Sequence, residues 1–188
     1  MKKMFKVMLL VLCAALLVAG RVLGTLAYLQ MKTGTVTNTF TVGQVAITLQ
    51  EYGINADGSK DTSTTTTTGI SDIKLVPGRV IEKNPFIKVA ANSEECYLFA
   101  KVVNGLGDDA TIAMAAGWTQ VTGTDYWVYG TKVAANAEVD IFTSFKCSTG
   151  VENGKTYTNN AIAVTAYAIQ AEGFADAQAA WAASGFGA

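Results

Sequence analysis

The stretch Cys96-Tyr97-Leu98-Phe99-Ala100-Lys101-Val102-Val103 decides the fold of this chain. Seven of its eight residues are apolar, and Lys101 is the single charge. Aromatic and β-branched side chains of this kind favour a pleated, half-buried backbone. The run is more continuous than any other candidate strand in the chain, which suits a strand at the centre of a sheet.

Further strand-like segments lie on both sides of this stretch. In Thr39–Glu51 apolar residues alternate with polar ones, which is the pattern of a half-buried strand. The further candidates are Phe86–Val89, Tyr126–Tyr129, Glu138–Cys147 and Ala161–Gln170. Turn signals separate them: Asp57-Gly58, Pro77-Gly78, Asn104-Gly105, Thr149-Gly150 and Asn153-Gly154. Short strands at this spacing predict an all-β fold, an antiparallel β-sandwich.

Two segments favour helix, and one favours a loop. Asp108-Asp109 resembles an N-cap before the helix formers Ala110–Ala116, and Phe174–Ala183 carries apolar residues near helical spacing. We expect both to be short helices at the periphery of the sandwich. Residues 52–70, which include the threonine run Thr62–Thr68, are predicted to form a long flexible loop, with glycosylation of the threonines as an alternative.

The beginning of the chain has the pattern of a secretory signal peptide. Lys2, Lys3 and Lys6 precede the uncharged apolar run Val7–Gly20. We expect residues 1–27 to be removed by a signal peptidase between Ala27 and Tyr28, and residues 28–188 to form one exported domain. Two alternatives are an uncleaved anchor, for which the apolar run is short, and a lipoprotein modified at Cys13, for which Leu12 is too large.

Removing the first 27 residues changes the charge of the protein. They hold four of the fourteen basic residues and none of the fifteen acidic ones, so the remaining chain has a net charge of about −5. Such a surface favours solubility and argues against nucleic acid as a partner.

The residues of most catalytic sites are missing from the sequence. The chain has no histidine, and therefore neither the usual general base at neutral pH nor the usual zinc ligand. Glu94-Glu95 and Asp108-Asp109 are adjacent pairs, and neighbours on a strand point to opposite faces. A calcium site from Asp57, Asp61 and Asp72 is conceivable, but its spacing matches no EF-hand. We therefore predict no catalytic residue, no metal and no cofactor.

Cys96 and Cys147 are the two cysteines that follow the signal peptide. Export permits a disulfide between them, provided that their strands bring the Cα atoms within about 7 Å. The alternative is a pair of buried free thiols.

Several segments in order resemble the TasA/camelysin family of exported proteins. They are Gly24-Thr25-Leu26-Ala27-Tyr28, Thr35-Val36-Thr37-Asn38-Thr39-Phe40-Thr41-Val42-Gly43, Leu75-Val76-Pro77-Gly78, Asn92-Ser93-Glu94 and the late stretch Ala163–Phe174. No single motif is specific, and their order and spacing carry the resemblance. The chain departs from the family at Leu29-Gln30-Met31-Lys32, where an aromatic and acidic stretch is common.

The resemblance implies a jelly-roll-like sandwich, processing by a SipW-type signal peptidase and a role in extracellular fibres of the biofilm matrix of Gram-positive bacteria. It also implies self-association by donor-strand exchange, in which the segment 28–36 of one subunit completes a sheet of the next. Leu29 and Met31 would lie on one face of this strand, Tyr28 and Gln30 on the other, and Val36 near its end. Other matrix or anchoring proteins are further expected partners.

Three alternatives stay open. The segment 28–36 can pair within its own subunit as an edge strand. The chain can be a cell-surface metallopeptidase, as camelysin has been regarded, although this needs a metal site without histidine. It can also be a monomeric surface module that binds a ligand through its loops.

The signal peptide generates the first prediction. When the full chain is exported by a Gram-positive host with a SipW-type peptidase, N-terminal sequencing of the secreted protein should begin at Tyr28. Replacing Ala27 by Lys should stop cleavage, because signal peptidases need small residues next to the bond that they cut. A secreted protein that still begins at Met1 would contradict this prediction.

Overall fold

The structure is a computed structural model that describes residues 2–28, 43–70, 73–152, 154, 155, 157 and 162–187. It divides into two units, Met1–Thr41 and Val42–Ala188. The first contains the helix α1 (Lys2–Tyr28). Within the described residues, no helix combines the length and apolarity needed to cross a lipid bilayer.

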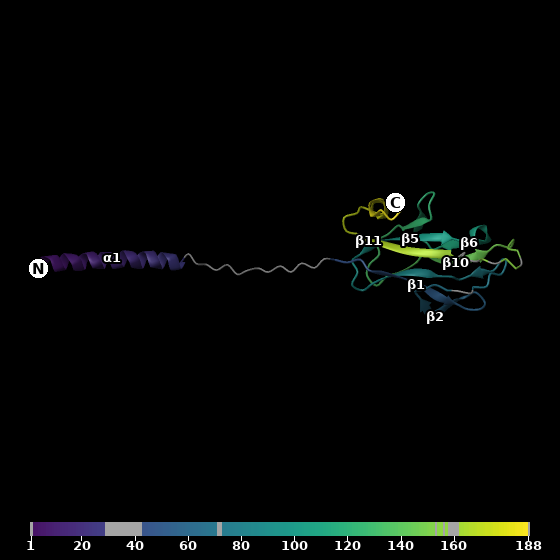
Figure 1. Ribbon diagram of the computed structural model, residues 1–188, viewed down its shortest axis with the longest axis horizontal. Coiled ribbons are helices and arrows are strands. Elements are labelled where there is room, and N and C mark those ends of the chain that lie inside the picture. The colour runs from purple at the N-terminus through teal and green to yellow at the C-terminus, as the bar shows by residue number, and fades with distance from the viewer. Residues whose placement is uncertain are drawn as a thin grey trace. The chain divides into compact units, whose positions relative to one another are not determined.

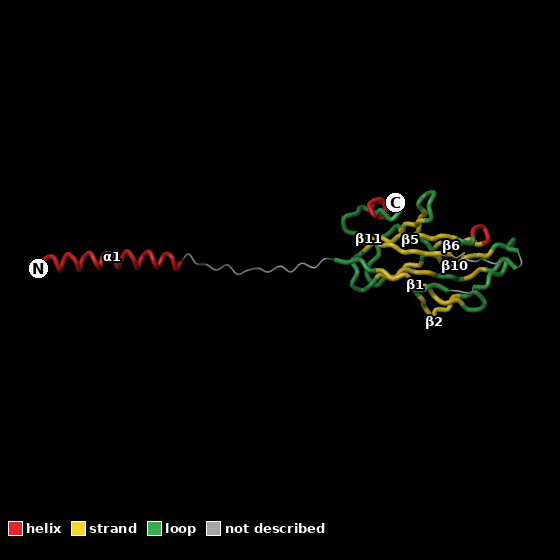
Figure 2. The backbone as a smooth tube through the Cα atoms, in the orientation of Figure 1, coloured by secondary structure: helices red, strands yellow, loops and turns green. Residues whose placement is uncertain are grey.

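The second unit is built from antiparallel strands, shown as yellow segments in Figure 2. Its first sheet has the order β2-β1-β4-β9 and its second the order β11-β5-β8-β7. A smaller sheet has the order β3-β10-β6. The bounds are β1 (Ile47–Ile54), β2 (Lys60–Thr66), β3 (Val80–Ile81), β4 (Pro85–Val89), β5 (Cys96–Asn104), β6 (Ala110–Met114), β7 (Trp118–Gln120), β8 (Tyr126–Tyr129), β9 (Glu138–Asp140), β10 (Phe142–Cys147) and β11 (Ile162–Gln170).

The layers enclose one main hydrophobic core (Figure 1). Alternate residues of β4 and β5 meet there, and Ile87, Val89, Leu98 and Ala100 have no exposed surface. This burial on one face of each sheet is the arrangement of a β-sandwich. The all-β antiparallel fold expected from the sequence is confirmed.

The opposite face of β5 is buried as well. Phe99 packs there against Trp181 of the helix α2 (Ala177–Ser184), with ring centroids 5.4 Å apart, and against Phe186, at 5.8 Å. The carboxylate of Asp176 caps α2 by accepting a hydrogen bond from the Ala179 N–H at 2.8 Å. The short helix predicted at Phe174–Ala183 is therefore confirmed, and it covers the second sheet.

Most predicted strands are confirmed within one or two residues, but Glu138–Cys147 is divided. Its first part, β9, pairs with β4, and its second part, β10, pairs with β6 and β3. Ile141 lies between them and is fully buried. The chain thus passes from one sheet to another within a segment that the sequence presents as one strand.

The helix predicted after Asp108-Asp109 is wrong. Only Gly107–Asp109 form a 3₁₀ turn, η1, and Ala110–Met114 are the strand β6. The helix propensity of the alanines is a weak determinant that tertiary pairing overrides: Ile112 lies opposite Phe145 of β10, and the ladder with that strand satisfies the backbone.

The long loop predicted at residues 52–70 is also wrong. β1 continues to Ile54, the chain turns at Asp57-Gly58, and β2 returns antiparallel along β1. Gly58 has φ +91°, which suits a glycine in a tight turn. Threonine is β-branched, so the low-complexity run is compatible with a strand at the edge of a sheet.

The double burial of β5 generates the second prediction. Replacing Phe99 by Ala should lower the free energy of unfolding by about 3–5 kcal/mol, because a fully buried ring is removed from between the sheet and α2. Urea denaturation measures the change. The matched control is Val103→Ala on the same strand, where the side chain is 37% exposed and the cost should stay below about 1 kcal/mol. Equal costs for the two variants would contradict the packing described here.

Candidate functional site

The residues predicted to form the assembly strand lie mostly outside the described residues. Tyr28 is the last residue of α1, and Ala27 precedes it in the same helix. Leu29, Met31 and Val36 fall within 29–42, which the structure does not describe. The cleavage bond and the donor strand therefore stay predictions, and the described residues bear on the surface that would receive such a strand.

Strand β11 has one open edge in the part of the chain that the structure describes. It pairs with β5 along all nine residues and stands last in its sheet. The Ala171 N–H donates to the carbonyl of Glu95 at 2.8 Å, and hydrogen-bonded pairs alternate along an antiparallel ladder. The backbone groups of Val164, Ala166 and Ala168 therefore point away from β5. β11 is also the longest edge strand among the described sheets.

The first half of β1 is open in the same way. β2 pairs with β1 only from Glu51 onward, so Ile47–Gln50 have β4 on one side and no described strand on the other. The Ala90 N–H donates to the Ala46 carbonyl at 2.9 Å. By the same alternation, the backbone groups of Ile47 and Leu49 point toward the open side.

The two open edges border one groove, which we call the edge groove. It has a volume of about 540 Å³ and is lined on one side by Leu49–Glu51 and on the other by Ile162–Val164, with Thr66–Ile70 beside them. Figure 1 shows β1 and β11 as neighbouring strands in the domain. The groove thus lies between two strands, with the segment Thr66–Ile70 forming part of its wall.

Apolar side chains on and beside the two open strands remain partly exposed. They pack against the main core, but unlike the residues of β4 and β5 they are only half-buried: Val45, Ile47, Leu49, Ile162, Val164, Ala166 and Ala168. Apolar surface left in contact with water is unfavourable, and burial removes that cost. An inserted strand would satisfy the backbone groups and cover these side chains together.

An ion pair lies at one end of the edge groove. The Lys83 ammonium contacts the Glu51 carboxylate, and their side chains are only 9% and 8% exposed. Removing one partner would leave a buried charge without compensation, which is costly. The pair therefore places two buried charges in a groove whose other lining residues are apolar, threonine or, at Gln50, an uncharged amide.

The structure does not support a disulfide between Cys96 and Cys147. Both are buried free cysteines. Cys96 begins β5, whereas Cys147 lies opposite Ala110, whose carbonyl accepts a hydrogen bond from Asn104 at the other end of β5. Eight residues of strand separate the two ends by roughly 26 Å, far beyond the reach of a disulfide.

Burial also determines the protonation state of these two thiols. It raises the pKa of Cys96 to about 11, with a smaller contribution from the charge of Glu95. Burial raises the pKa of Cys147 as well, helped by the charge of Asp109. Both groups are therefore protonated and unreactive near neutral pH.

The acidic residues considered for calcium serve local turns. Asp57 accepts hydrogen bonds from the hydroxyl and N–H of Ser59, and Asp61 does the same with Ser63. These bonds lower the pKa of each carboxyl. Asp72 lies outside the described residues, within which no cluster of three potential ligands (His, Cys, Asp or Glu) occurs.

The two acidic pairs are separated by the fold. Glu95 forms a long, exposed ion pair with Lys132 at 3.8 Å, and the Glu94 N–H donates to the Gln44 carbonyl. Asp109 contacts Lys155 and accepts a hydrogen bond from Tyr157 at 2.9 Å, and these contacts lower the pKa of its carboxyl. Nothing in this geometry pairs two carboxylates around a substrate.

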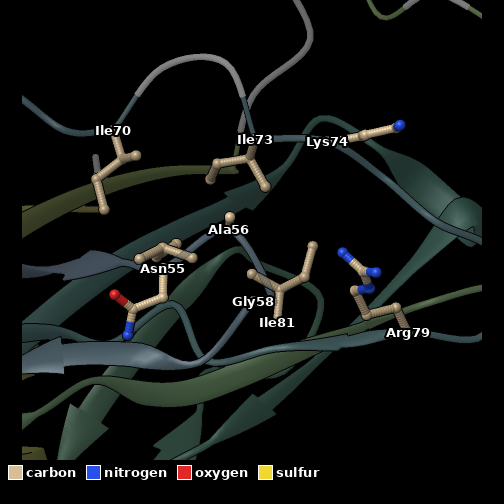
Figure 3. Close-up of a pocket in the computed structure, with 9 residues that line it drawn as sticks. Asn55, Ala56, Gly58, Ile70, Ile73, Lys74, Arg79 and Ile81 are labelled. Carbon is tan, nitrogen blue, oxygen red and sulfur yellow. The ribbon is translucent and has the colours of Figure 1, made fainter.

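A second pocket, of about 310 Å³, lies beside the β1–β2 turn. Figure 3 shows Ile70, Ile73 and Ile81 around it, with Lys74 and Arg79 on one side of the view. It combines apolar walls with two cations, a combination that the sequence does not reveal because these residues come from separate turns.

Comparisons with protein-family models, with curated proteins and with solved structures found no match for this chain.

The buried thiols generate the third prediction. In a Cys13→Ser variant at pH 7, a maleimide should leave Cys96 and Cys147 unmodified in the folded protein and label both in denaturant, because the raised pKa and burial suppress the thiolate. Mass spectrometry counts the labels. Rapid labelling of the folded protein would show that the ends of β5 and β10 are open to solvent.

Proposed function

We propose that this chain is an exported, non-enzymatic subunit of extracellular fibres that assembles by donor-strand exchange. The supporting observation is the edge groove, where β11 and the first half of β1 offer unpaired backbone groups above half-buried apolar side chains. An added strand gains affinity from main-chain hydrogen bonds and specificity from alternate side chains that enter the groove.

The proposed occupant is the segment 28–36 of a second copy. It has nine residues, the same number as β11, so it can pair along the full length of that edge. Leu29 and Met31 are apolar and occupy one face of an extended strand. That face would cover the half-buried row of β11, while Tyr28 and Gln30 would face outward.

Head-to-tail pairing of this kind produces filaments. The donor and the acceptor are different surfaces of the same chain, so each copy receives one strand and donates another. Such contacts continue indefinitely unless the rotation between copies closes a ring. In this proposal the signal peptide controls when assembly begins, because its removal after Ala27 frees the donor end to reach a neighbour.

The location and the further partners expected from the family resemblance are part of the same proposal. We place the fibres outside the cell, in the matrix of a Gram-positive biofilm, where anchoring or other matrix proteins would be further partners. The absence of histidine from the sequence supports a structural role over peptidase activity. A jelly-roll-like strand path is part of the proposal.

The fourth prediction tests the donor and the groove separately. Purified protein 28–188 should form fibres visible by electron microscopy, and protein 37–188 should not. A synthetic peptide of residues 28–36 should bind to 37–188, as measured by calorimetry. Fibres of equal length from both proteins would exclude donor-strand exchange through this segment.

The groove is tested by a matched pair of variants on β11. Val164→Lys places a charge among the half-buried side chains of the edge groove and should abolish both fibres and peptide binding. Thr165→Lys places the same charge on the exposed opposite face and should leave both intact. Urea denaturation confirms that both variants fold. Loss of fibres in both variants or in neither would contradict the assignment of the groove.

A further inference from the structure

The amine of Lys60 lies against the side-chain amide of Asn84. Lys60 Nζ is 3.0 Å from Asn84 Oδ1. Lys60 begins β2, and Asn84 immediately precedes β4. The contact therefore joins two segments that are 24 residues apart in the chain.

Two further hydrogen bonds hold these segments in register. The Glu82 N–H donates to the Gly58 carbonyl at 2.8 Å, and the Lys60 N–H donates to Glu82 Oε2 at 2.9 Å. Lys60 and Asn84 thus meet because the backbones beside them are fixed. This differs from a surface contact made by a freely moving lysine.

The amide of Asn84 is buried and oriented. Asn84 is 2% exposed, and its Nδ2 donates to the Phe142 carbonyl at 3.2 Å. On the other side, Lys60 Nζ lies 5.0 Å from the centre of the Tyr52 ring, which stacks on Phe86 at 4.8 Å. The amine and the amide therefore meet against an aromatic wall.

We propose that Lys60 and Asn84 form an intramolecular isopeptide bond. The uncharged Nζ attacks Cγ of Asn84, the Nζ–Cγ bond forms and the Cγ–Nδ2 bond breaks. One proton of Nζ passes to Nδ2, which leaves as ammonia. No electron is gained or lost, and no co-reactant is needed.

Proximity makes such a step feasible without an enzyme. Groups held in contact react with effective concentrations of about 10⁵–10⁸ M in favourable geometries. The nucleophile is the uncharged form of the amine, so the step should accelerate as the pH rises. A single slow event in the lifetime of the protein is sufficient, because loss of ammonia makes it irreversible in dilute solution.

The bond would fasten the edge of the first sheet. β2 is an edge strand held by a ladder with β1 that is irregular at Tyr52–Gly53. A covalent link to the residue before β4 would keep β2 from separating without altering the edge groove. The proposal concerns the folded single chain and does not depend on fibre assembly.

The test is the intact mass of the folded full chain. The wild-type protein should be lighter than its sequence-calculated mass by one ammonia, and a proteolytic digest should contain a branched peptide that joins Lys60 to Asn84. Asn84 precedes Pro85, which has no N–H, so a succinimide cannot form there through the following backbone nitrogen.

Three variants complete the experiment. Lys60→Arg keeps the positive charge and should restore the full mass, whereas Lys88→Arg, at an exposed lysine, should keep the loss of ammonia. Asn84→Ala removes the amide that would supply the ammonia and should likewise restore the full mass. A wild-type mass equal to the calculated one, or a loss that persists in Lys60→Arg, would overturn the isopeptide bond.

Discussion

The structure depends on the burial of β5 on both faces and the pairing of both its edges. Leu98 and Ala100 enter the core between the sheets, while Phe99 on the opposite face packs under α2. The ladders with β11 and β8 satisfy its backbone. Cys96–Ala100 are buried and must be apolar, because each polar group inside would need its own partner, whereas Lys101 and Val103 nearer the end of β5 are partly exposed. The other strands of this sheet are arranged on either side of β5, in the order β11-β5-β8-β7.

The two long edge strands of the described sheets, β2 and β11, differ in the polarity of their side chains. β2, at one edge, carries threonine, serine, lysine and aspartate, and such polar side chains discourage further pairing. β11, at another, carries Ile162, Val164, Ala166 and Ala168 toward the core and remains partly open. Proteins usually protect a long apolar edge. The polar edge at β2 discourages pairing with another chain, whereas the apolar edge at β11 permits it. This difference favours association at one edge of the molecule.

Sequence patterns predict the strands whose conformation is marked by neighbouring residues. They miss the strands and the groove that depend on residues distant in the chain. β5, β8 and β11 are marked by apolar or alternating residues within each strand, and their predicted bounds agree with the structure within about one residue. β6 looks helical because alanines are good helix formers, and only its partner β10, about thirty residues later, makes it a strand. β2 looks like a loop for a different reason: its partner β1 is its neighbour in the chain, but its threonine-rich sequence lacks the alternation of apolar and polar residues that marks a strand. The edge groove joins Leu49 to Val164, and no local pattern reveals that they are neighbours.

The physical demands of assembly also bear on the fold itself. A filament built by strand insertion transmits tension through the acceptor sheet, so strands beside the groove must resist separation better than the inserted strand does. Around β1 this resistance comes from the full ladder with β4 and from the buried pair of Glu51 and Lys83. β2 is weaker, because its ladder covers only half of β1 and is interrupted. If the chain assembles as proposed, we expect this hairpin to open under load before β4 does, and the contact between Lys60 and Asn84 lies where a covalent link would oppose that opening.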